Sequence, residues 1–298
     1  MSNTARYGLT TPGLTLNVDR HSSWEKSATI ADIAAVAQAA DRLGYDHLTC
    51  SEHVGIPVDV EKIRGGRYYD PLAIFGYLAA VTPRIRLATY VLVLGYSHPL
   101  EIAKRYGTLD VVSGGGRVIL GLGVGSLKPE FDLLGLGGAE FAERGKRGDE
   151  ALRALRAAWG KRLPVFHGEI YDFDDFIIDP CALSEEVPFW IGGRSMRSLK
   201  RAVTLGDGWA PFGLSVEQMG KMIAEARQLP EWSARATPID LALRHDGLLD
   251  PQAKPEEAAD AIRATFAVGA TKVNLGFVHQ SRAHFIEQLE ALAALAVD

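Results

Sequence analysis

The sequence predicts a single closed (β/α)8 barrel, in which parallel strands alternate with helices. Strand and helix patterns alternate along almost the whole chain, as in folds built on a parallel sheet. Several strand patterns are continuous apolar runs, which is typical of strands covered on both faces. The chain has 298 residues, 47% of them hydrophobic, and can therefore bury a large core, either as one barrel or as two smaller domains.

The alternation can be followed in chain order. Strands are expected at 6–16, 47–50, 84–95, 117–126, 189–193, 208–212, 239–243 and 271–277. Helices are expected at 30–43, 71–81, 99–113, 143–159, 196–205, 219–229, 255–268 and from the last strand to the end. Between 162 and 188 the alternation fails, and spaced aromatic residues indicate a hairpin-like excursion. Eight strand patterns favour a barrel over a doubly wound sheet. No linker or repeat divides the chain, so we expect one domain over 1–298, with loop insertions at the carboxyl mouth.

The stretch from 84 to 126 shows the pattern best. Two apolar runs flank a segment whose apolar residues recur every three or four positions, which predicts a helix with one buried face. The residues of this face are Ile102, Tyr106, Leu109 and Val112. Pro99 suits the first helical turn, and the glycines from 114 to 116 end the helix. Ligands of parallel α/β folds bind beyond the carboxyl ends of the strands, so the residues after Leu94 and Leu120 are candidates for a site.

The composition excludes several classes of function. A net charge of −5 offers no bulk attraction to nucleic acid or to an anionic membrane. Cys50 and Cys181 lie far apart, and we expect reduced thiols in a cytoplasmic protein. No apolar run is long enough to cross a membrane, and the amino terminus lacks a signal pattern. The eight histidines show no metal-ligand spacing, so no metal site is expected. Motifs for a phosphate-binding Gly-Lys-Ser loop and for a Gly-x-Ser-x-Gly elbow are also lacking.

Two glycine-rich turns follow predicted strands. Gly121, Gly123 and Gly125 either let a flat ligand approach the backbone or make room for neighbouring strands, and both interpretations remain open. Their spacing and mid-chain position do not fit a dinucleotide fingerprint. The second turn, from Ile191 to Ser195, leads into a helix whose first N–H groups can bind phosphate. Arg194 and Arg197 would then face an anion; alternatively, they are part of a solvated basic surface.

Two histidines follow strands at the predicted mouth. His53 comes just after the second strand, where an imidazole can exchange a proton with a substrate hydroxyl or carbonyl. A lone histidine is more often structural, and both roles remain open at this stage. His98 is a weaker candidate and can act as the cap of the helix that follows it.

Several motifs in colinear order carry a family resemblance. They are Ser51-Glu52-His53, Leu87 to Leu94 with Ser97-His98-Pro99, Leu109 to Arg117, Gly121 to Ser126 with Glu130-Phe131, and Trp190 to Gly193 with Gly206 to Trp209. Over roughly residues 6–212 the chain resembles the bacterial luciferase-like superfamily, and within it the coenzyme F-420-dependent oxidoreductase branch. The resemblance implies a TIM barrel that holds a flavin or 5-deazaflavin at its carboxyl mouth, usually in a homodimer or higher homo-oligomer.

The resemblance also implies roles for single residues. His53 matches the catalytic histidine of the family. A non-prolyl cis peptide is expected between Tyr90 and Val91, where the ring lies against strand three; a small residue is common at the Tyr90 position, so the side on which Tyr90 projects is open. Ser126 stands where F-420-dependent sugar-phosphate dehydrogenases carry a catalytic Glu, so their reaction is not expected with the same acid. The expected cofactor-binding residues are Glu52, Thr89, Tyr90, Val91, Gly123, Gly125, Ser126, Ile191, Gly192, Gly193, Arg194 and Ser195.

Three functions remain open. The first is hydride transfer between coenzyme F-420 and a small organic substrate, with His53 as proton donor or acceptor. The second is an FMN-dependent monooxygenase that uses reduced FMN and oxygen, since Glu52-His53 also resembles the luciferase branch. The third is a non-catalytic flavin-binding relative. Lys62, Arg64 and Arg67 meet the acidic tail of F-420, act as a lid, or form a solvated loop. The loops 54–70, 127–140 and 244–254 are expected to shape the substrate pocket. Their mixed composition does not identify a class of substrate.

Overall fold

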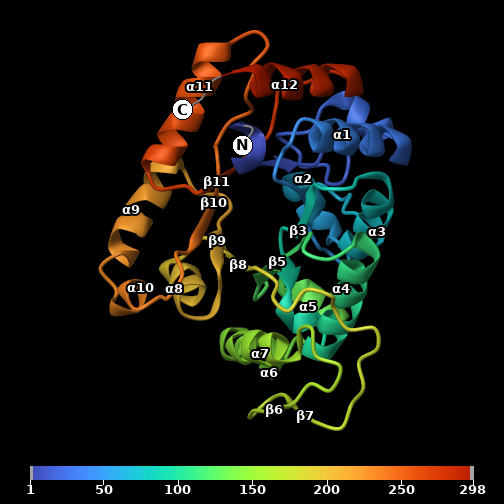
Figure 1. Cartoon of the computed structure of the whole chain (residues 1–298), viewed down its shortest axis with the longest axis vertical. Helices are drawn as coiled ribbons and strands as arrows, with labels where there is room; N and C mark the ends of the chain where they lie inside the picture. The colour runs from blue at the N-terminus through green and yellow to red at the C-terminus, as the bar shows by residue number, and fades with distance from the viewer. Residues whose placement is uncertain (1–2, 296–298) are drawn as a thin grey trace.

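Eight parallel strands form a closed barrel in the computed structural model, which describes residues 3–295 (Figure 1). They are β1 (Tyr7–Thr10), β2 (His47–Cys50), β3 (Arg86–Thr89), β5 (Val118–Gly123), β8 (Phe189–Gly192), β9 (Gly208–Ala210), β10 (Asp240–Arg244) and β11 (Lys272–Leu275). The pairings of β1 with β11 and of β3 with β5 close the circle. The short strand β4 (Leu92–Val93) continues β3 and also pairs with β5. The predicted barrel is confirmed, and each predicted strand range overlaps one of its strands.

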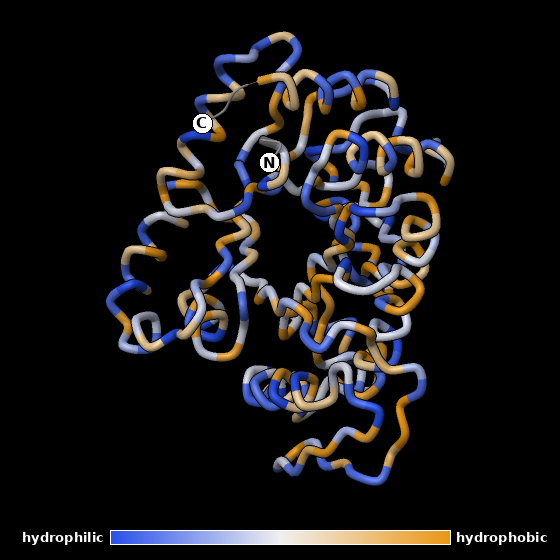
Figure 2. The backbone as a smooth tube through the Cα atoms, viewed as in Figure 1, coloured by the Kyte–Doolittle hydropathy of each residue, from blue (hydrophilic) through white to orange (hydrophobic). Residues whose placement is uncertain are grey.

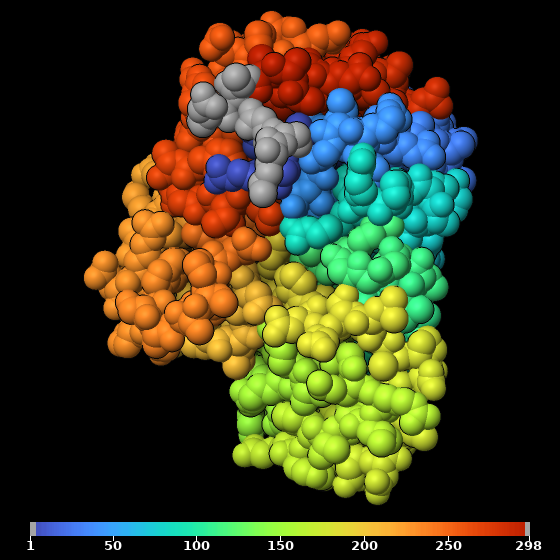
Figure 3. All heavy atoms as spheres, viewed as in Figure 1, coloured from blue at the N-terminus to red at the C-terminus, as the bar shows by residue number. Residues whose placement is uncertain are grey.

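Long helices surround the strands. They are α1 (Ile30–Arg42), α3 (Pro71–Val81), α4 (Pro99–Ser113), α7 (Arg144–Ala158), α8 (Met196–Leu205), α9 (Val216–Ala226), α11 (Pro255–Ala267) and α12 (Arg282–Ala294). Figure 2 shows hydrophobic and hydrophilic residues alternating along such helices, for example α9, whose buried residues are Met219, Ile223 and Ala226. The first and last helices lie side by side, α12 next to α1, as Figure 3 also shows. No helix among the described residues combines the length and the apolar character needed to cross a membrane.

Short elements occupy the connections. They are η1 (Asn3–Arg6), η2 (Ser23–Ser27), η3 (Leu94–Tyr96), α2 (Val58–Arg64), α5 (Lys128–Leu133), α6 (Ala139–Ala142) and α10 (Pro230–Ser233). The predicted excursion contains an antiparallel hairpin, formed by β6 (Phe166–His167) and β7 (Asp172–Phe173). Phe176 in this excursion is exposed rather than packed. The two cysteines carry free thiols, Cys50 buried and Cys181 partly exposed.

The helix boundaries follow the predicted signals. Pro99 occupies the first turn of α4, and Gly114 ends this helix with a left-handed φ of 91°. Gly44 follows α1 with a φ of 78°. The predicted apolar face of α4 is wrong at one position, because Val112 is exposed. Asp110 is buried instead, since its carboxylate accepts hydrogen bonds from the backbone N–H groups of Gly116 and Ser184.

Two layers of buried residues hold the barrel together. The larger layer lies between strands and helices. The smaller one fills the lumen and consists of Ala88, Ile119, Trp190, Ala210 and Ala242, with Tyr90 packed against it. Three of the five lumen residues are alanines, because the interior of an eight-stranded barrel is only wide enough for a few side chains. The lumen is therefore a packed core, and a ligand can enter only above it, at the mouth.

Candidate active site

His53 lies at the carboxyl mouth, three residues beyond the end of β2. Its Nδ1 is 2.8 Å from Oε2 of Glu130, a residue of α5. The His53 ring also meets the ring of Tyr68 edge to face, with centroids 4.4 Å apart. Because a carboxylate can only accept, Nδ1 carries the hydrogen and Nε2 is the nitrogen left for proton exchange. The structure thus gives His53 the orientation that an acid or base requires.

Glu130 organises this part of the mouth. Its side chain is 1% exposed and accepts hydrogen bonds from Tyr96 Oη at 2.9 Å and from the backbone N–H of Val54 and Gly55 at 2.8 and 3.3 Å. Burial alone would raise the pKa of Glu130, but the hydrogen bonds and the His53 ring hold it below its usual value. Glu130 is therefore an anion that fixes both the ring and the loop after β2.

The role of Glu130 is not evident from the sequence. Glu130 and His53 are 77 positions apart, and no spacing rule connects two loops that follow different strands. The available signal is topological, since β2 and β5 are both neighbours of β3 and their carboxyl ends open on the same mouth. An acid beyond β5 can therefore reach a histidine beyond β2.

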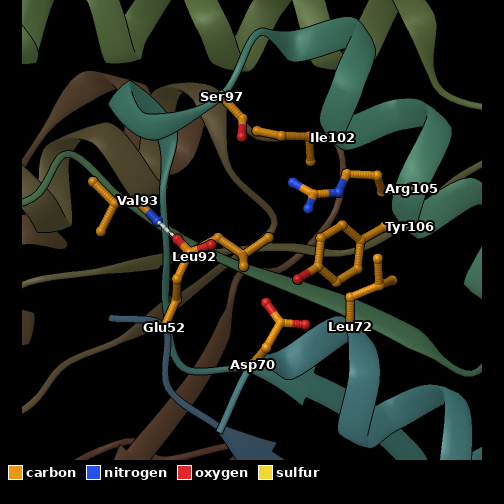
Figure 4. A pocket seen from close by; sticks show the side chains of 9 residues that line it. All are labelled: Glu52, Asp70, Leu72, Leu92, Val93, Ser97, Ile102, Arg105 and Tyr106. Atoms are coloured by element: carbon orange, nitrogen blue, oxygen red, sulfur yellow. Dashed lines mark hydrogen bonds between the residues drawn. The ribbon is translucent and has the colours of Figure 1, made fainter. Parts of the chain in front are cut away.

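Glu52, the neighbour of His53, contacts the backbone of β4. Its Oε2 accepts a hydrogen bond of 2.7 Å from the backbone N–H of Val93 in β4. Figure 4 shows the carboxylate in a small pocket together with Asp70, Arg105 and Tyr106. Burial raises the pKa of Glu52 to about 7, and the carboxylate of Asp70 adds to the effect. Glu52 thus supports β4, whereas His53 is held by Glu130.

The predicted cis peptide is present between Tyr90 and Val91. The side chain of Val91 fills space left by three glycines. A Cβ at Gly121, Gly123 or Gly192 would come within 3.4, 2.8 or 2.6 Å of Val91 side-chain atoms. At Gly121 it would also meet the Thr89 carbonyl oxygen. The packing of the chain itself therefore leaves no room for a side chain at these positions, which supports the second interpretation for Gly121 and Gly123, while the approach of a ligand to this backbone stays a prediction.

Tyr90 projects into the barrel. Its ring packs on the lumen cluster, and its hydroxyl donates a hydrogen bond of 2.5 Å to the carbonyl of Pro211, just beyond β9. Burial raises the pKa of Tyr90 to about 12. Thr89 faces the barrel wall, where its hydroxyl donates to the Gly121 carbonyl. Tyr90 therefore forms part of the floor of the mouth, and Thr89 holds β3 to β5.

The turn after β8 has the predicted geometry. Gly193 has a φ of 123°, and Ser195 caps α8 by accepting a hydrogen bond from the Ser198 N–H. The Ile191 side chain belongs to the outer core, so only its backbone is open to a ligand. Arg194 is exposed at the turn. The residues expected at the phosphate site are thus brought together, whereas a bound phosphate remains a prediction.

The remaining candidate residues differ in what they contact. Gly125 has a φ of 76° and packs against Phe131, with Ser126 following at the mouth. The Arg67 guanidinium donates hydrogen bonds to the carbonyls of Glu25 and Lys26. It therefore connects two segments of the chain, and these donors are not free for an acidic ligand. Lys62 and Arg64 lie on the exposed helix α2. His98 caps α4 through its Nδ1, as predicted, and burial lowers its pKa.

Several buried polar side-chain atoms lack a hydrogen-bond partner among residues 3–295. Those at the mouth are Thr11 Oγ1, Arg244 Nε and His245 Nδ1, whereas Asn274 Nδ2 lies in the lumen and Trp190 Nε1 and Tyr7 Oη lie toward the amino end. Buried polar groups are nearly always satisfied, so the atoms at the mouth mark a place where a polar ligand fits. The donor set suits the carbonyl and ring nitrogen atoms of a flavin-type group. Over the same residues, no three His, Cys, Asp or Glu side chains are arranged to hold a metal ion.

Comparisons with known proteins place the chain among flavin-related enzymes. A family model described as luciferase-like monooxygenase matches residues 12–297. An uncharacterized protein of Mycobacterium tuberculosis is 28% identical over 255 residues, which cover 81% of this chain and 83% of the relative. The FMNH2-dependent dimethylsulfone monooxygenase of Pseudomonas putida is 26% identical over 70% of this chain and 55% of its own length. The coenzyme F420-dependent tetrahydromethanopterin reductase of Methanopyrus kandleri superposes with a TM-score of 0.74 at 15% identity, over 97% of both chains.

Proposed function

Since this chain belongs to the luciferase-like monooxygenase family, we propose that it is an oxidoreductase that transfers a hydride between coenzyme F-420 and a small organic substrate. The members of this family are oxidoreductases and monooxygenases, and its relatives use either of two cofactors. The choice of F-420 rests on the motif resemblance, together with the fold shared with an F-420-dependent reductase.

The His53–Glu130 pair is the observation that carries the proposal. Glu130 holds the Nδ1–H of His53, and Tyr96 donates to the same carboxylate oxygen. The ring is thereby fixed with Nε2 free to give a proton to a substrate carbonyl or to take one from a hydroxyl. Hydride transfer to or from such a substrate needs this proton movement, and a lone structural histidine would not need a buried carboxylate and tyrosine behind it.

The cofactor would lie above the lumen cluster. Val91 and the backbone after β5 would form the wall beside its ring, and the turn from Gly192 to Ser195 would receive its phosphate. When bound, a deazaflavin supplies a carbon that gives or accepts the hydride. The polar atoms without partners at the mouth support a ligand of this polarity.

A second candidate is an FMN-dependent monooxygenase. It is favoured by the 26% identical relative, whose name states dependence on FMNH2, and by the Glu52-His53 pair. Since a deazaflavin does not readily activate oxygen, the cofactor decides the class of reaction. A third candidate, a flavin-binding protein without catalysis, would retain the barrel and make no use of His53.

A side-by-side titration separates the three candidates. The purified chain is titrated with F-420 and with FMN, each oxidised and reduced, and the fluorescence of the cofactor is followed. Selective binding of F-420 supports hydride transfer, and selective binding of reduced FMN moves the protein to the oxygen-using class. Tight binding without turnover over a panel of alcohols, carbonyls and activated alkenes would favour the third candidate. Binding of neither cofactor would refute the proposal.

A further inference from the structure

Arg244 is a cation at the mouth that the proposed reaction does not yet use. It is the last residue of β10, where the chain leaves the barrel. Side chains alternate along a strand, and Ala242 belongs to the lumen cluster whereas Leu241 and Leu243 belong to the outer core. Arg244, two residues beyond Ala242, therefore projects to the inner side, directly above the lumen.

The guanidinium has no counter-ion. Its Nε is buried without a hydrogen-bond partner, and no side-chain hydrogen bond or ion pair of Arg244 is found within residues 3–295. The nearest carboxylate in sequence, Asp246, accepts instead from the backbone N–H of Val216. Burial lowers the pKa of Arg244, and the positive charge of Arg20 lowers it further. Only the Nε atom of Arg244 is buried and the side chain as a whole is partly exposed, so a guanidinium without an ion pair at the mouth is available to bind an anion.

Asn274 is the polar neighbour of Arg244 in the barrel. The two residues are register partners in the paired strands β10 and β11 and therefore lie on the same inner face. The Oδ1 atom of Asn274 is 2.6 Å from Nε2 of His47, which fixes the amide. Asn274 lies deeper in the lumen than Arg244, because its Oδ1 is bound to His47 at the start of β2 and its amide also interacts with the Tyr90 hydroxyl, so Arg244 is the donor that faces the mouth.

We infer that Arg244 binds a carboxylate group of the substrate. The inference rests on the proposed function, because it names the class of molecule that this site would oxidise or reduce. A planar guanidinium matches the two oxygens of a carboxylate, and one unpaired cation matches one negative charge. The cofactor phosphate is expected elsewhere, at the start of α8, and β9 separates β8 from β10. The Tyr90 hydroxyl donates to the carbonyl of Pro211 and is neutral, because burial raises its pKa to about 12, so it does not neutralise the charge of Arg244.

Calorimetric titration with matched pairs of probes tests the inference. Acetate and benzoate carry the charge, whereas acetamide and benzamide have nearly the same shape without it. The wild-type chain should bind the carboxylates and prefer each over its amide, both with and without the oxidised cofactor. Arg244→Met should weaken benzoate binding at least tenfold, as expected for the loss of a charged hydrogen bond. Arg244→Lys keeps the positive charge but lacks the planar guanidinium with its two parallel N–H donors, and it should retain part of the affinity.

Thermal unfolding of the same variants distinguishes binding from support of the fold. Because Arg244 makes no side-chain hydrogen bond or ion pair within residues 3–295, Arg244→Met should leave the Tm nearly unchanged. Arg235→Met is the control, since the Arg235 guanidinium donates to the carbonyls of Val203 and Gly206 at the far end of the barrel. This control should lower the Tm and leave benzoate binding intact.

Three outcomes would overturn the inference. They are equal binding of benzoate by the wild type and Arg244→Met, no preference of the wild type for carboxylate over amide, and a large loss of Tm in Arg244→Met. A variant that loses affinity for the cofactor instead of benzoate would assign Arg244 to the cofactor. Carboxylate binding by a chain that binds neither F-420 nor FMN would refute the proposed function and leave this inference standing.

Discussion

The two ends of the barrel differ in how their basic side chains are paired. At the amino end, the carboxylate of Asp46 lies 2.6 Å from His47 Nδ1, 2.6 Å from Arg86 Nη2 and 3.0 Å from Lys272 Nζ. At the carboxyl end, His53 is paired with Glu130, but Arg244 makes no ion pair and its Nε is buried without a partner. The basic groups at the amino end thus share a carboxylate, whereas one basic group at the mouth has none. This contrast locates stability at the amino end and ligand binding at the mouth.

The largest expected effect lies at the mouth. His53→Ala should lower turnover roughly 10²- to 10⁴-fold, because the variant loses the group that exchanges the proton. Cofactor affinity and Tm should remain as in the wild type, and steady-state kinetics with fluorescence titration measures both. His167→Ala is the control, since His167 pairs with Asp172 on the exposed hairpin. An unaltered rate in His53→Ala, with a proven substrate, would remove His53 from the mechanism.

The next effect belongs to the amino end. Asp46→Asn leaves three basic groups without their carboxylate and should destabilise the fold by about 3 to 5 kcal/mol, measured by urea unfolding. Burial alone would raise the pKa of Asp46, but His47, Arg86 and Lys272 hold it well below its usual value. Because the pKa is lower in the folded state, this stabilisation is present above about pH 4 and is lost as the pH falls further.

Two observations check the assignment of Asp46. Glu217→Gln breaks an exposed pair with Lys221 and should leave the unfolding midpoint unchanged. The activity per folded molecule of Asp46→Asn should equal that of the wild type. A loss of turnover without a loss of stability would contradict the division between the two ends.

A smaller effect is expected at Gly123, where the packing of the barrel adjoins the proposed cofactor site. In Gly123→Ala the new methyl group would lie 2.8 Å from Val91, so the turn beside the cofactor has to shift. We expect a destabilisation of about 1 to 3 kcal/mol, together with weaker cofactor binding in the same titration. Gly76→Ala lies in α3 with nothing within 4 Å of the new atom, and it should stabilise the fold slightly. Equal stability of the two variants would show that Val91 does not need this space.

The smallest effect concerns the pH dependence of stability. Burial raises the pKa of Glu52 to about 7, above its unfolded value near 4.5. The folded state therefore binds the proton more tightly, and the contribution of Glu52 to stability falls as the pH rises from about 4.5 to about 7. Glu52→Gln resembles the protonated form, so its Tm should exceed that of the wild type above pH 7 and equal it near pH 4. A Tm difference that does not vary with pH would contradict this shift.

The strands were predictable because parallel strands buried on both faces leave continuous apolar runs. The first strand is the least accurate case: 6–16 was expected, and β1 covers only Tyr7–Thr10. The chain turns at Gly13, which has a φ of 79°, and beyond it only Thr15 forms an isolated bridge, to Tyr68. The apolar pattern reports burial, and burial continues past the end of the hydrogen-bonded strand, at Leu14 for example.

The site was predictable only where one short segment carries it. His53 and the Tyr90–Val91 bond could be placed from local motifs and a family resemblance. Glu130 and Arg244 could not be assigned, because their roles depend on which strands are neighbours in the closed barrel. The glycines after β5 illustrate the same limit. Their sequence does not tell whether a ligand or Val91 occupies the space beside them, and only the packed structure does.

The pairing of His53 with Glu130 also bears on how the protein inactivates on heating. His53 belongs to the loop after β2, which carries the exposed helix α2, and Glu130 belongs to the short helix α5 after β5. Such segments open locally at a lower free energy than the strands beneath them. Enzyme activity would therefore disappear at a lower temperature than the far-ultraviolet circular dichroism signal of the helices and strands. The difference between the two temperatures would report how much more easily the segments that carry His53 and Glu130 open than the strands do.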